Sequence, residues 1–319
     1  MSKKILLLLL VVSFVFVPLH MSASVNGFVI TSYEYKLDTL SSATGSFGMP
    51  FVWLILQDKL SESFSYHVWY DFQNSDFLMA WIDVKLLDFL SLSGGKIVAP
   101  SNQEWYTYPP DQLTPFFSEI SGFVGQIGKG FDYGVGFSGN YNIFNYNVTL
   151  LNGDNNDKKD ICARFTISPI KDLAIAFHTY QIWATATEDK RDLNGVDFKY
   201  TGYNLDIRAE YDFGKGGQVL TIGPAEITPG SYKGYYIMAG YRVKLNDYTA
   251  FQPVFKYNVF DLDVTGYDPV SDLVLGANFF VGKYFKLMRG YRKITDDKNA
   301  LYTNNDKKDD IMIRAQLSF

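Results

Sequence analysis

The chain has one cysteine, Cys162, in 319 residues, and only three histidines. A single thiol excludes an internal disulfide and a zinc site built from several cysteines. After residue 24 only His67 and His178 remain, on separate predicted strands, with no serine or acid motif beside either. An enzyme is therefore the less favoured class, and we expect no catalytic residues, cofactor or metal. We interpret both histidines as hydrated side chains that face the lumen of a β-barrel, the fold that the alternation of the chain predicts.

Long apolar runs and an excess of positive charge are also missing. After the first 24 residues no run reaches about 20 apolar residues, which excludes a transmembrane helix there. With 29 basic and 34 acidic residues the net charge is −5. An acidic balance argues against a nucleic-acid partner. No apolar stripe with a 3.6-residue period is present either, so the pattern predicts an all-β protein.

The N-terminus has the three parts of a secretory signal. Lys3 and Lys4 supply the charge, residues 5–18 the apolar region, and Ser22-Ala23-Ser24 a small-residue cleavage site. We predict a cleaved signal peptide over residues 1–24 and a single barrel domain over 25–319. Losing the two lysines takes the net charge from −5 to −7. The alternative is an uncleaved anchor, for which the apolar run is short.

Aromatic residues, in contrast, are abundant. They make up 17% of the chain, and the mean hydropathy is near zero, at −0.06. Transmembrane β-barrels carry aromatic girdles at both membrane interfaces, while half of each strand faces water. The interfaces are the expected place for the five tryptophans, and the alternative is an aromatic track for sugars inside a channel. These residues are Trp53, Trp69, Trp81, Trp105 and Trp183.

The region after the signal consists of segments with period-two alternation. The last, residues 311–319, alternates strictly and ends in Phe319, like the closing strand of bacterial outer-membrane barrels. The alternation predicts a transmembrane antiparallel β-barrel of sixteen strands. They span residues 26–37, 47–59, 62–72, 77–86, 89–98, 131–138, 142–151, 160–168, 172–183, 195–200, 203–213, 233–245, 249–261, 272–281, 284–292 and 309–319.

The connections between these strands alternate in length. Every second one is very short, as at residues 60–61 and 282–283, whereas the others are mostly long. Bacterial barrels have short periplasmic turns and long outer loops, so the parity places both termini on the periplasmic side. A soluble all-β protein, the alternative, would have no reason for such alternation. We therefore predict the bacterial outer membrane as the location and its lipid as a partner.

Alternation also assigns one face of each strand to a lumen, which sixteen strands leave open as an aqueous channel. The predicted basic pore-lining residues are Arg164, Arg208, Arg242, Lys244, Lys256, Lys286, Arg292 and Arg314. The predicted acidic ones are Asp71, Asp83, Asp206 and Glu210. The basic residues concentrate on the last strands and would favour anions along one wall; alternatively, all these charges only hydrate the lumen and pair with each other. By parity Arg289 points outward, where we expect a membrane interface or a bulge.

The third long connection, residues 99–130, is the longest in the chain. Loops beyond about 15 residues are usually functional, and aromatic side chains are poorly placed in free solvent. We predict that this loop folds into the lumen and constricts it; the alternatives are an outer lid or a trimer contact. The predicted constriction residues are Glu104, Trp105, Tyr106, Tyr108, Phe116 and Phe117. Lys129, at the end of the loop, is its only lysine.

Several stretches, in order along the chain, resemble the phosphate-selective porin O and P family. They are Ile82–Lys85, Leu90–Glu104, Tyr146–Gly153, Arg208–Tyr211, Gly234–Tyr241, Pro253–Tyr257 and the closing strand. The resemblance implies a homotrimeric channel with an anion preference carried by lumen arginines. The prediction is an outer-membrane diffusion channel for small hydrophilic solutes, weakly selective or anion-leaning, with phosphate as one candidate. The alternatives are a channel specific for sugars or other small solutes, and a non-conducting structural or enzymatic barrel.

Overall fold

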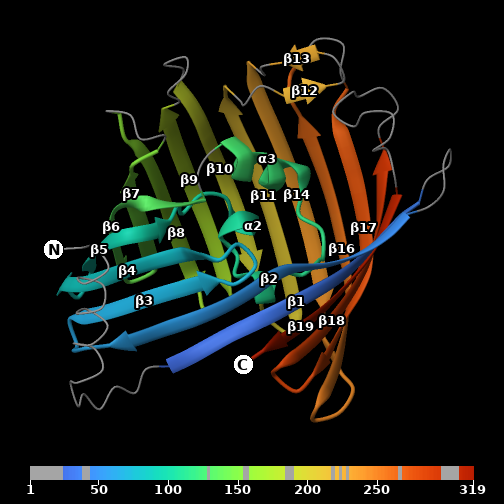
Figure 1. The fold of residues 1–319 in the computed structure, drawn as a ribbon, viewed down its shortest axis with the longest axis horizontal. Helices are drawn as coiled ribbons and strands as arrows, with labels where there is room; N and C mark the ends of the chain where they lie inside the picture. The colour runs from blue at the N-terminus through green and yellow to red at the C-terminus, as the bar shows by residue number, and fades with distance from the viewer. Residues whose placement is uncertain are drawn as a thin grey trace.

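In the computed structural model the strands form one closed antiparallel barrel (Figure 1). The structure describes residues 24–37, 44–127, 130–153, 158–183, 190–216, 220–222, 225–227, 230–264, 268–295 and 309–319. Residues 1–23 of the predicted signal peptide and Lys129 lie outside these residues. No helix in the described ranges is long and apolar enough to cross a membrane.

The barrel has sixteen strands, so the predicted fold class is confirmed. The first eight are β1 (Ser24–Leu37), β2 (Thr44–Lys59), β3 (Phe64–Asp71), β4 (Asp76–Leu87), β5 (Leu90–Val98), β6 (Phe131–Tyr141), β7 (Phe144–Leu151) and β8 (Asp160–Ile170). The others are β9 (Leu173–Trp183), β10 (Lys190–Tyr200), β11 (Leu205–Lys215), β14 (Ser231–Tyr241) continued by β15 (Val243–Lys244), β16 (Thr249–Asp261), β17 (Val270–Val281), β18 (Phe285–Thr295) and β19 (Asp309–Ser318). A separate hairpin is formed by β12 (Leu220–Ile222) and β13 (Ala225–Ile227).

The first and last strands close the barrel. Phe28 on β1 lies opposite Ser318 on β19, and the ladder runs from there to Leu37 opposite Asp309. Beyond it, the Gly27 and Phe319 backbones exchange hydrogen bonds of 2.9 and 3.0 Å. Closure removes the two unpaired edges that an open sheet would present.

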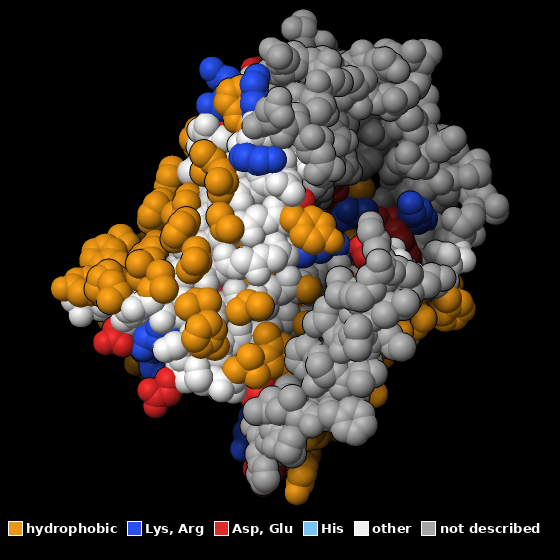
Figure 2. Space-filling view, turned by 60° about the vertical axis from the view of Figure 1, so that its left-hand side comes forward, with side chains coloured by type: hydrophobic (Ala, Val, Ile, Leu, Met, Phe, Trp, Pro, Cys, Tyr) orange, Lys and Arg blue, Asp and Glu red, His pale blue; other side chains and the backbone are white. Residues whose placement is uncertain are grey.

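The two faces of the strands differ as the alternation predicts. On β11, Tyr211 and Phe213 point outward and are exposed, whereas Arg208, Glu210 and Asp212 point inward and are buried. Figure 2 shows apolar side chains spread over the outer surface on one side of the barrel. This pattern places lipid-compatible groups outside and charged groups inside.

Arg289 faces outward, as its parity predicts. It lies opposite Ala277 on β17 and Ile313 on β19, and the register is continuous on both sides. A bulge is therefore not the reason for its position. Its cross-strand neighbours are apolar, so this guanidinium interrupts the apolar outer surface of β18.

The segment between β5 and β6 lies within the ring of strands (Figure 1). It contains α2 (Gln103–Tyr106), a short 3-10 helix η1 (Pro109–Asp111) and α3 (Glu119–Ile127). The Asn102 side chain caps α2 by accepting a hydrogen bond from the Trp105 N–H at 3.1 Å. Pro109 begins η1, where its missing N–H leaves no donor unpaired. We call residues 99–127 the inner segment.

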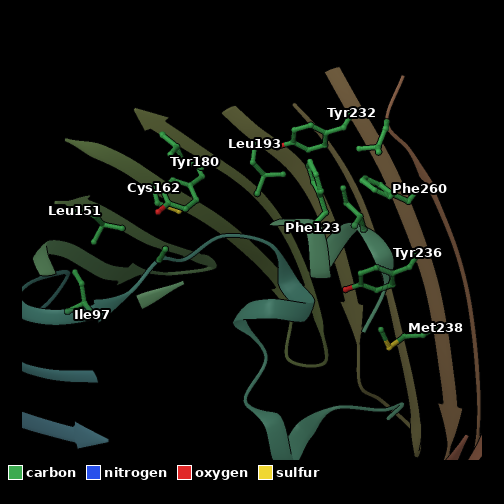
Figure 3. Packing of buried hydrophobic residues seen from close by; sticks show 14 of the residues in the cluster. Ile97, Phe123, Leu151, Cys162, Tyr180, Leu193, Tyr232, Tyr236, Met238 and Phe260 are labelled. Carbon is green, nitrogen blue, oxygen red and sulfur yellow. The ribbon is translucent and has the colours of Figure 1, made fainter. Parts of the chain in front are cut away.

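A buried apolar cluster follows the inner face of the barrel from β5 to β16 and includes Ile120 and Phe123 of α3 (Figure 3). The Phe123 ring contacts Tyr232 on β14 and Phe260 on β16, with centroids 4.8 and 5.1 Å apart. Gly234 lets α3 approach β14, because a Cβ there would lie 2.9 Å from the Ile120 Cβ. In a soluble β-sandwich the apolar core lies between two sheets. Here it lies between the barrel wall and the inner segment that covers it.

Candidate functional site

The central contact of the inner segment is a buried ion pair. Glu104 on α2 accepts a hydrogen bond of 2.6 Å from the Lys256 ammonium on β16, and both side chains are almost completely buried. Lys256 also donates to the Phe116 carbonyl at 3.0 Å. The second Glu104 oxygen accepts from the Ser118 N–H and hydroxyl, at 2.7 and 2.6 Å. The pair thus has the extra hydrogen bonds that a buried charge requires.

Other inward-facing donors bind backbone carbonyls around η1. Arg208 on β11 donates to the Asp111 carbonyl at 3.0 Å. Lys286 on β18 donates to the carbonyls of Pro110 and Gln112, and Asn278 on β17 donates to the Leu113 carbonyl at 2.9 Å. Four consecutive carbonyls, those of residues 110–113, are therefore held by the wall.

Arg292 on β18 connects α3 to the wall. Its guanidinium lies 3.1 Å from a Glu119 oxygen in the first turn of α3 and also pairs with Asp310 on β19. An acidic side chain in the first turn is favourable next to the positive end of a helix. Arg292 therefore joins two acidic partners, one from the inner segment and one from the wall.

Carboxylates on β10 and β11 hold the start of the inner segment. Glu210 accepts a hydrogen bond of 2.5 Å from the Gln103 N–H, and Asp212 accepts one of 3.3 Å from the Asn102 side chain. Asp197 accepts one of 2.8 Å from the Gln103 amide. These acidic side chains are buried because the inner segment covers them.

His178 on β9 lies among the same carboxylates. Its Nε2 is 2.8 Å from Asp212, and its Nδ1 is 3.5 Å from Asp197. The expectation of a hydrated histidine is wrong here, since His178 is fully buried. Ligand atoms of His178, Glu210 and Asp212 lie within 4.8 Å of one another, close enough for a metal ion. Both carboxylates already accept hydrogen bonds from the inner segment. Their role in holding this segment explains why the three side chains lie close together.

Arg164 on β8 balances part of this negative charge. It donates to Asp197 at 2.7 Å and to the Ser101 carbonyl at 3.0 Å. Lys199 lies on the inner face of β10. It is not among the basic residues predicted to line the pore, although it shares its parity with Asp197. It lies close enough to Arg164 and Arg208 to interact electrostatically, and Lys286 interacts likewise with Arg208 and Arg242. We call Arg164, Lys199, Arg208, Arg242 and Lys286 the basic arc.

In the described part of the chain, the remaining predicted basic residues form no hydrogen bond with the inner segment. The Arg242 guanidinium stacks over Phe280, 3.7 Å from the ring centroid. Lys244 pairs with Asp247 at 3.0 Å in an exposed turn. Arg314 lies on the inner face of β19, and its Nε finds no hydrogen-bond partner among the residues that the structure describes.

Three of the predicted acidic residues pair with side chains or backbone groups close to them in the chain or on a neighbouring strand. Asp83 accepts hydrogen bonds from Trp81 at 2.9 Å and Ser93 at 2.5 Å, and it lies 3.1 Å from His67. Asp71, at the end of β3, accepts from the Gln73 N–H at 2.9 Å and the Asn74 side chain at 2.7 Å. Asp206 pairs with Arg208 at 2.8 Å.

Four of the five tryptophans lie inside the barrel. Trp53, Trp69 and Trp81 project from β2, β3 and β4, and together with Trp105 on α2 they line one cavity of about 570 Å³. The interface position expected for the tryptophans is therefore wrong for these four, because parity places the strand residues on the inner face. Among the predicted constriction residues, Tyr106, Tyr108 and Phe117 line the same cavity, whereas Phe116 is buried against Arg292.

Comparison with solved structures gives the same architecture over more than nine-tenths of the chain. OmpF of Salmonella typhi, solved in complex with daunomycin, matches with a TM-score of 0.72 at 9% identity, over 93% of this chain and 97% of that one. OmpT of Vibrio cholerae matches with 0.66 at 16% identity, over 93% and 97%. The anion-selective porin of Comamonas acidovorans matches with 0.63 at 12% identity, over 94% and 100%. At these identities the likeness concerns the fold.

Sequence comparison supports the resemblance over part of the chain. No curated protein matches. The family model for phosphate-selective porin O and P matches residues 184–319, which include Arg208–Tyr211, Gly234–Tyr241, Pro253–Tyr257 and the closing strand. The stretches before residue 184 that suggested the resemblance lie outside the match. The chain thus has the fold of outer-membrane porins, and its last seven barrel strands, from β10 to β19, carry the sequence match to the phosphate-selective porin O and P family.

Proposed function

We propose that this protein is an outer-membrane channel for small hydrophilic solutes, with a weak preference for anions. The observation that carries this proposal is the basic arc on the inner face of the barrel, across β8, β10, β11, the Arg242 position and β18. Positive groups lining a narrow aqueous path raise the local concentration of anions. The porin fold and the family match over residues 184–319 favour a channel over an enzyme.

Within this channel, the inner segment is the constriction. Its contacts with β10, β11, β16, β17 and β18 support a fixed position across the lumen. Solutes would pass between the uncovered parts of the wall and this segment. A constriction held by buried charges stays in place while solutes diffuse past it.

The preference is weak because most lumen charges are already paired. Lys256 binds Glu104, Arg164 binds Asp197, and Arg208 binds Asp206. A paired cation attracts a passing anion less than a free one does. Phosphate is one candidate solute, and the basic arc would be where it interacts.

Export and assembly complete the proposal. The signal at residues 1–24 would be removed during export to the bacterial outer membrane, leaving a chain that starts near Val25. A homotrimer is the proposed assembly, since one of the solved OmpT structures is described as a trimer form. Outer-membrane lipid would surround the outer apolar surface.

Planar-bilayer recording of the refolded mature protein tests the function. We expect stable ohmic openings and a reversal potential on the chloride side in a KCl gradient. Added phosphate should reduce the current if it binds the basic arc. A folded barrel without conductance would overturn the channel, whereas a reversal potential on the potassium side would overturn only the anion preference.

A further inference from the structure

One cavity in the described structure has walls of a different chemistry from the rest of the lumen. It lies between the inner face of β2–β6 and the inner segment, and has a volume of about 570 Å³. Tryptophan, tyrosine and phenylalanine rings make up most of its lining. We call it the aromatic pocket. It lies on the wall opposite the charged contacts that hold the inner segment.

The rings of the aromatic pocket form two separate groups. On the barrel wall Trp69 contacts Trp53, Trp81 and Tyr108, with centroids 6.0, 6.4 and 5.7 Å apart. On the other side Trp105 contacts two phenylalanines, each at 6.4 Å. Of the ring contacts within the described ranges, none joins the two groups. The rings within each group are tilted to one another by 44 to 73°. Because the two groups do not touch, they line separate sides of the cavity rather than close around one point, which suits a ring-shaped solute that contacts both.

The charges of the lining exclude an anion. Its charged side chain is Asp71, and no lysine or arginine belongs to the lining in the described part of the chain. Each Asp71 oxygen accepts one hydrogen bond, from Gln73 and from Asn74. A carboxylate has about four acceptor positions, so Asp71 can accept further hydrogen bonds from hydroxyl groups of a solute. A purely apolar solute would instead leave these remaining acceptor positions without partners, which is costly.

The indole groups add donors to this lining. The Nε1 atoms of Trp53, Trp69 and Trp105 are buried and have no acceptor among the described residues. A buried donor without a partner costs about 1–3 kcal/mol. These atoms have almost no exposed surface, so a solute that carries oxygen atoms can supply their acceptors only after the rings turn toward it. Hydroxyl groups, which both donate and accept, therefore fit Asp71 and the indoles together.

We propose that the aromatic pocket binds a neutral pyranose sugar. The apolar C–H face of the sugar ring would stack on the tryptophans, and its hydroxyls would donate to Asp71 and accept from the indole N–H groups. Asn74 borders the pocket from the turn between β3 and β4, the shortest connection at the barrel end that carries the long loops. Because this turn is short, the barrel wall is low at this point, and a sugar can enter the pocket from that side. This proposal rests on the channel function only in assigning the sugar as a transported solute.

Calorimetric titration of the folded protein in detergent tests the binding. Maltose is the probe, and sorbitol is the matched control, because it carries hydroxyls but no ring. We expect saturable heat with maltose and a quench of tryptophan emission, since four of the five tryptophans line the pocket. Asp71→Asn and Trp105→Leu should each weaken maltose binding at least tenfold. Trp183→Phe, outside the pocket, should bind as the unmodified protein does.

The other outcomes are equally informative. Far-UV circular dichroism and the heat-dependent shift in gel migration establish that each variant is folded. Absence of maltose binding by the folded protein would overturn the proposal, as would equal binding by the unmodified protein and both pocket variants. Binding of choline or benzoate in place of maltose would assign the pocket to a cation or an anion instead. Conductance without sugar binding leaves the channel standing, whereas sugar binding without conductance leaves the site standing and removes the channel.

Discussion

The inner segment contacts the barrel through two unlike surfaces. Toward β8–β18 it is held by ion pairs and hydrogen bonds, with the Glu104–Lys256 pair of 2.6 Å at the centre, in addition to the apolar packing of α3 on β14 and β16. Toward β1–β5 its contacts are between aromatic rings, such as Tyr108 with Phe28 at 5.2 Å. Buried charges must meet their partners at fixed distances, whereas ring contacts tolerate gaps. The charged surface therefore fixes the segment, and the aromatic surface leaves a cavity.

Breaking the Glu104–Lys256 ion pair should have the largest effect on the stability of the protein. Lys256→Met leaves the Glu104 carboxylate buried without its cation, which typically costs about 3–5 kcal/mol. The free energy of unfolding, measured by urea titration in detergent, should fall accordingly, and single-channel current should become noisier. Lys233→Met removes a lysine from an exposed pair with Asp261 and should cost about 0–1 kcal/mol.

The double variant sharpens this test. Adding Glu104→Gln to Lys256→Met removes the unpaired charge, so much of the lost stability should return. If the double variant is no more stable than the single one, buried charge is not what fixes the segment. The charged surface would then hold the segment by shape alone.

Removing one member of the basic arc should have the next largest effect. Arg242→Gln removes a partly exposed cation that stacks on Phe280, and the chloride-to-potassium permeability ratio should fall roughly twofold to fivefold. The reversal potential in a KCl gradient measures this ratio. The difference should shrink in 1 M salt, where charges are screened within about 3 Å. An unchanged ratio, equal to that of the control Lys293→Gln on the outer face, would contradict the role of the arc.

A pH titration addresses the aromatic surface. Burial, and next the Asp111 charge, raise the pKa of Tyr108 to about 12 from its ordinary value of 10. The folded state thus favours the neutral phenol, and its contribution to stability is present below pH 10 and lost as the pH rises toward 12. Tyr108→Phe should remove this part of the alkaline loss, as followed by the urea midpoint at pH 9 and pH 11.5. If the variant loses as much stability as the unmodified protein, Tyr108 does not carry the loss.

The smallest effect is expected at an exposed pair away from both surfaces. A hydrogen bond from Lys85 and its charge lower the pKa of Asp88, in the turn after β4. Its stabilisation is present above the ordinary pKa and is lost as the pH falls below it. Because both groups are in solvent, Asp88→Asn should leave the urea midpoint unchanged at pH 7. A shift as large as that of Lys256→Met would mean that solvent exposure does not indicate how much such an ion pair contributes to stability.

The sequence was sufficient to predict the strands that form the wall of the barrel. A strand that must face lipid on one side and water on the other shows strict alternation, so all sixteen strands and the outward position of Arg289 follow from parity. Strand ends were less well defined: β10 begins at Lys190 rather than at residue 195, since its first residues do not alternate clearly.

The interior could not be predicted in the same way. Parity places Lys256 and Trp69 on the inner face, but it contains no information about what lies opposite them. Their partners, Glu104 and Tyr108, belong to a segment without alternation, and contact depends on three-dimensional closure. Composition alone assigns the tryptophans to the interfaces, whereas Trp69 shares its parity with the predicted pore-lining Asp71 and therefore points inward. For inner positions parity is the more reliable of the two signals.

The anchors of the inner segment also determine when it can take its place during assembly. The Gln103 amide binds a residue 94 positions later, the Glu104 partner comes 152 positions later, and the Pro110 carbonyl binds a lysine 176 positions later. Contacts between such distant residues form late in folding, because closing a long loop is entropically costly. Until β18 has joined the sheet, the inner segment lacks the last of these anchors. The inner segment therefore reaches its final position only in the late steps of assembly.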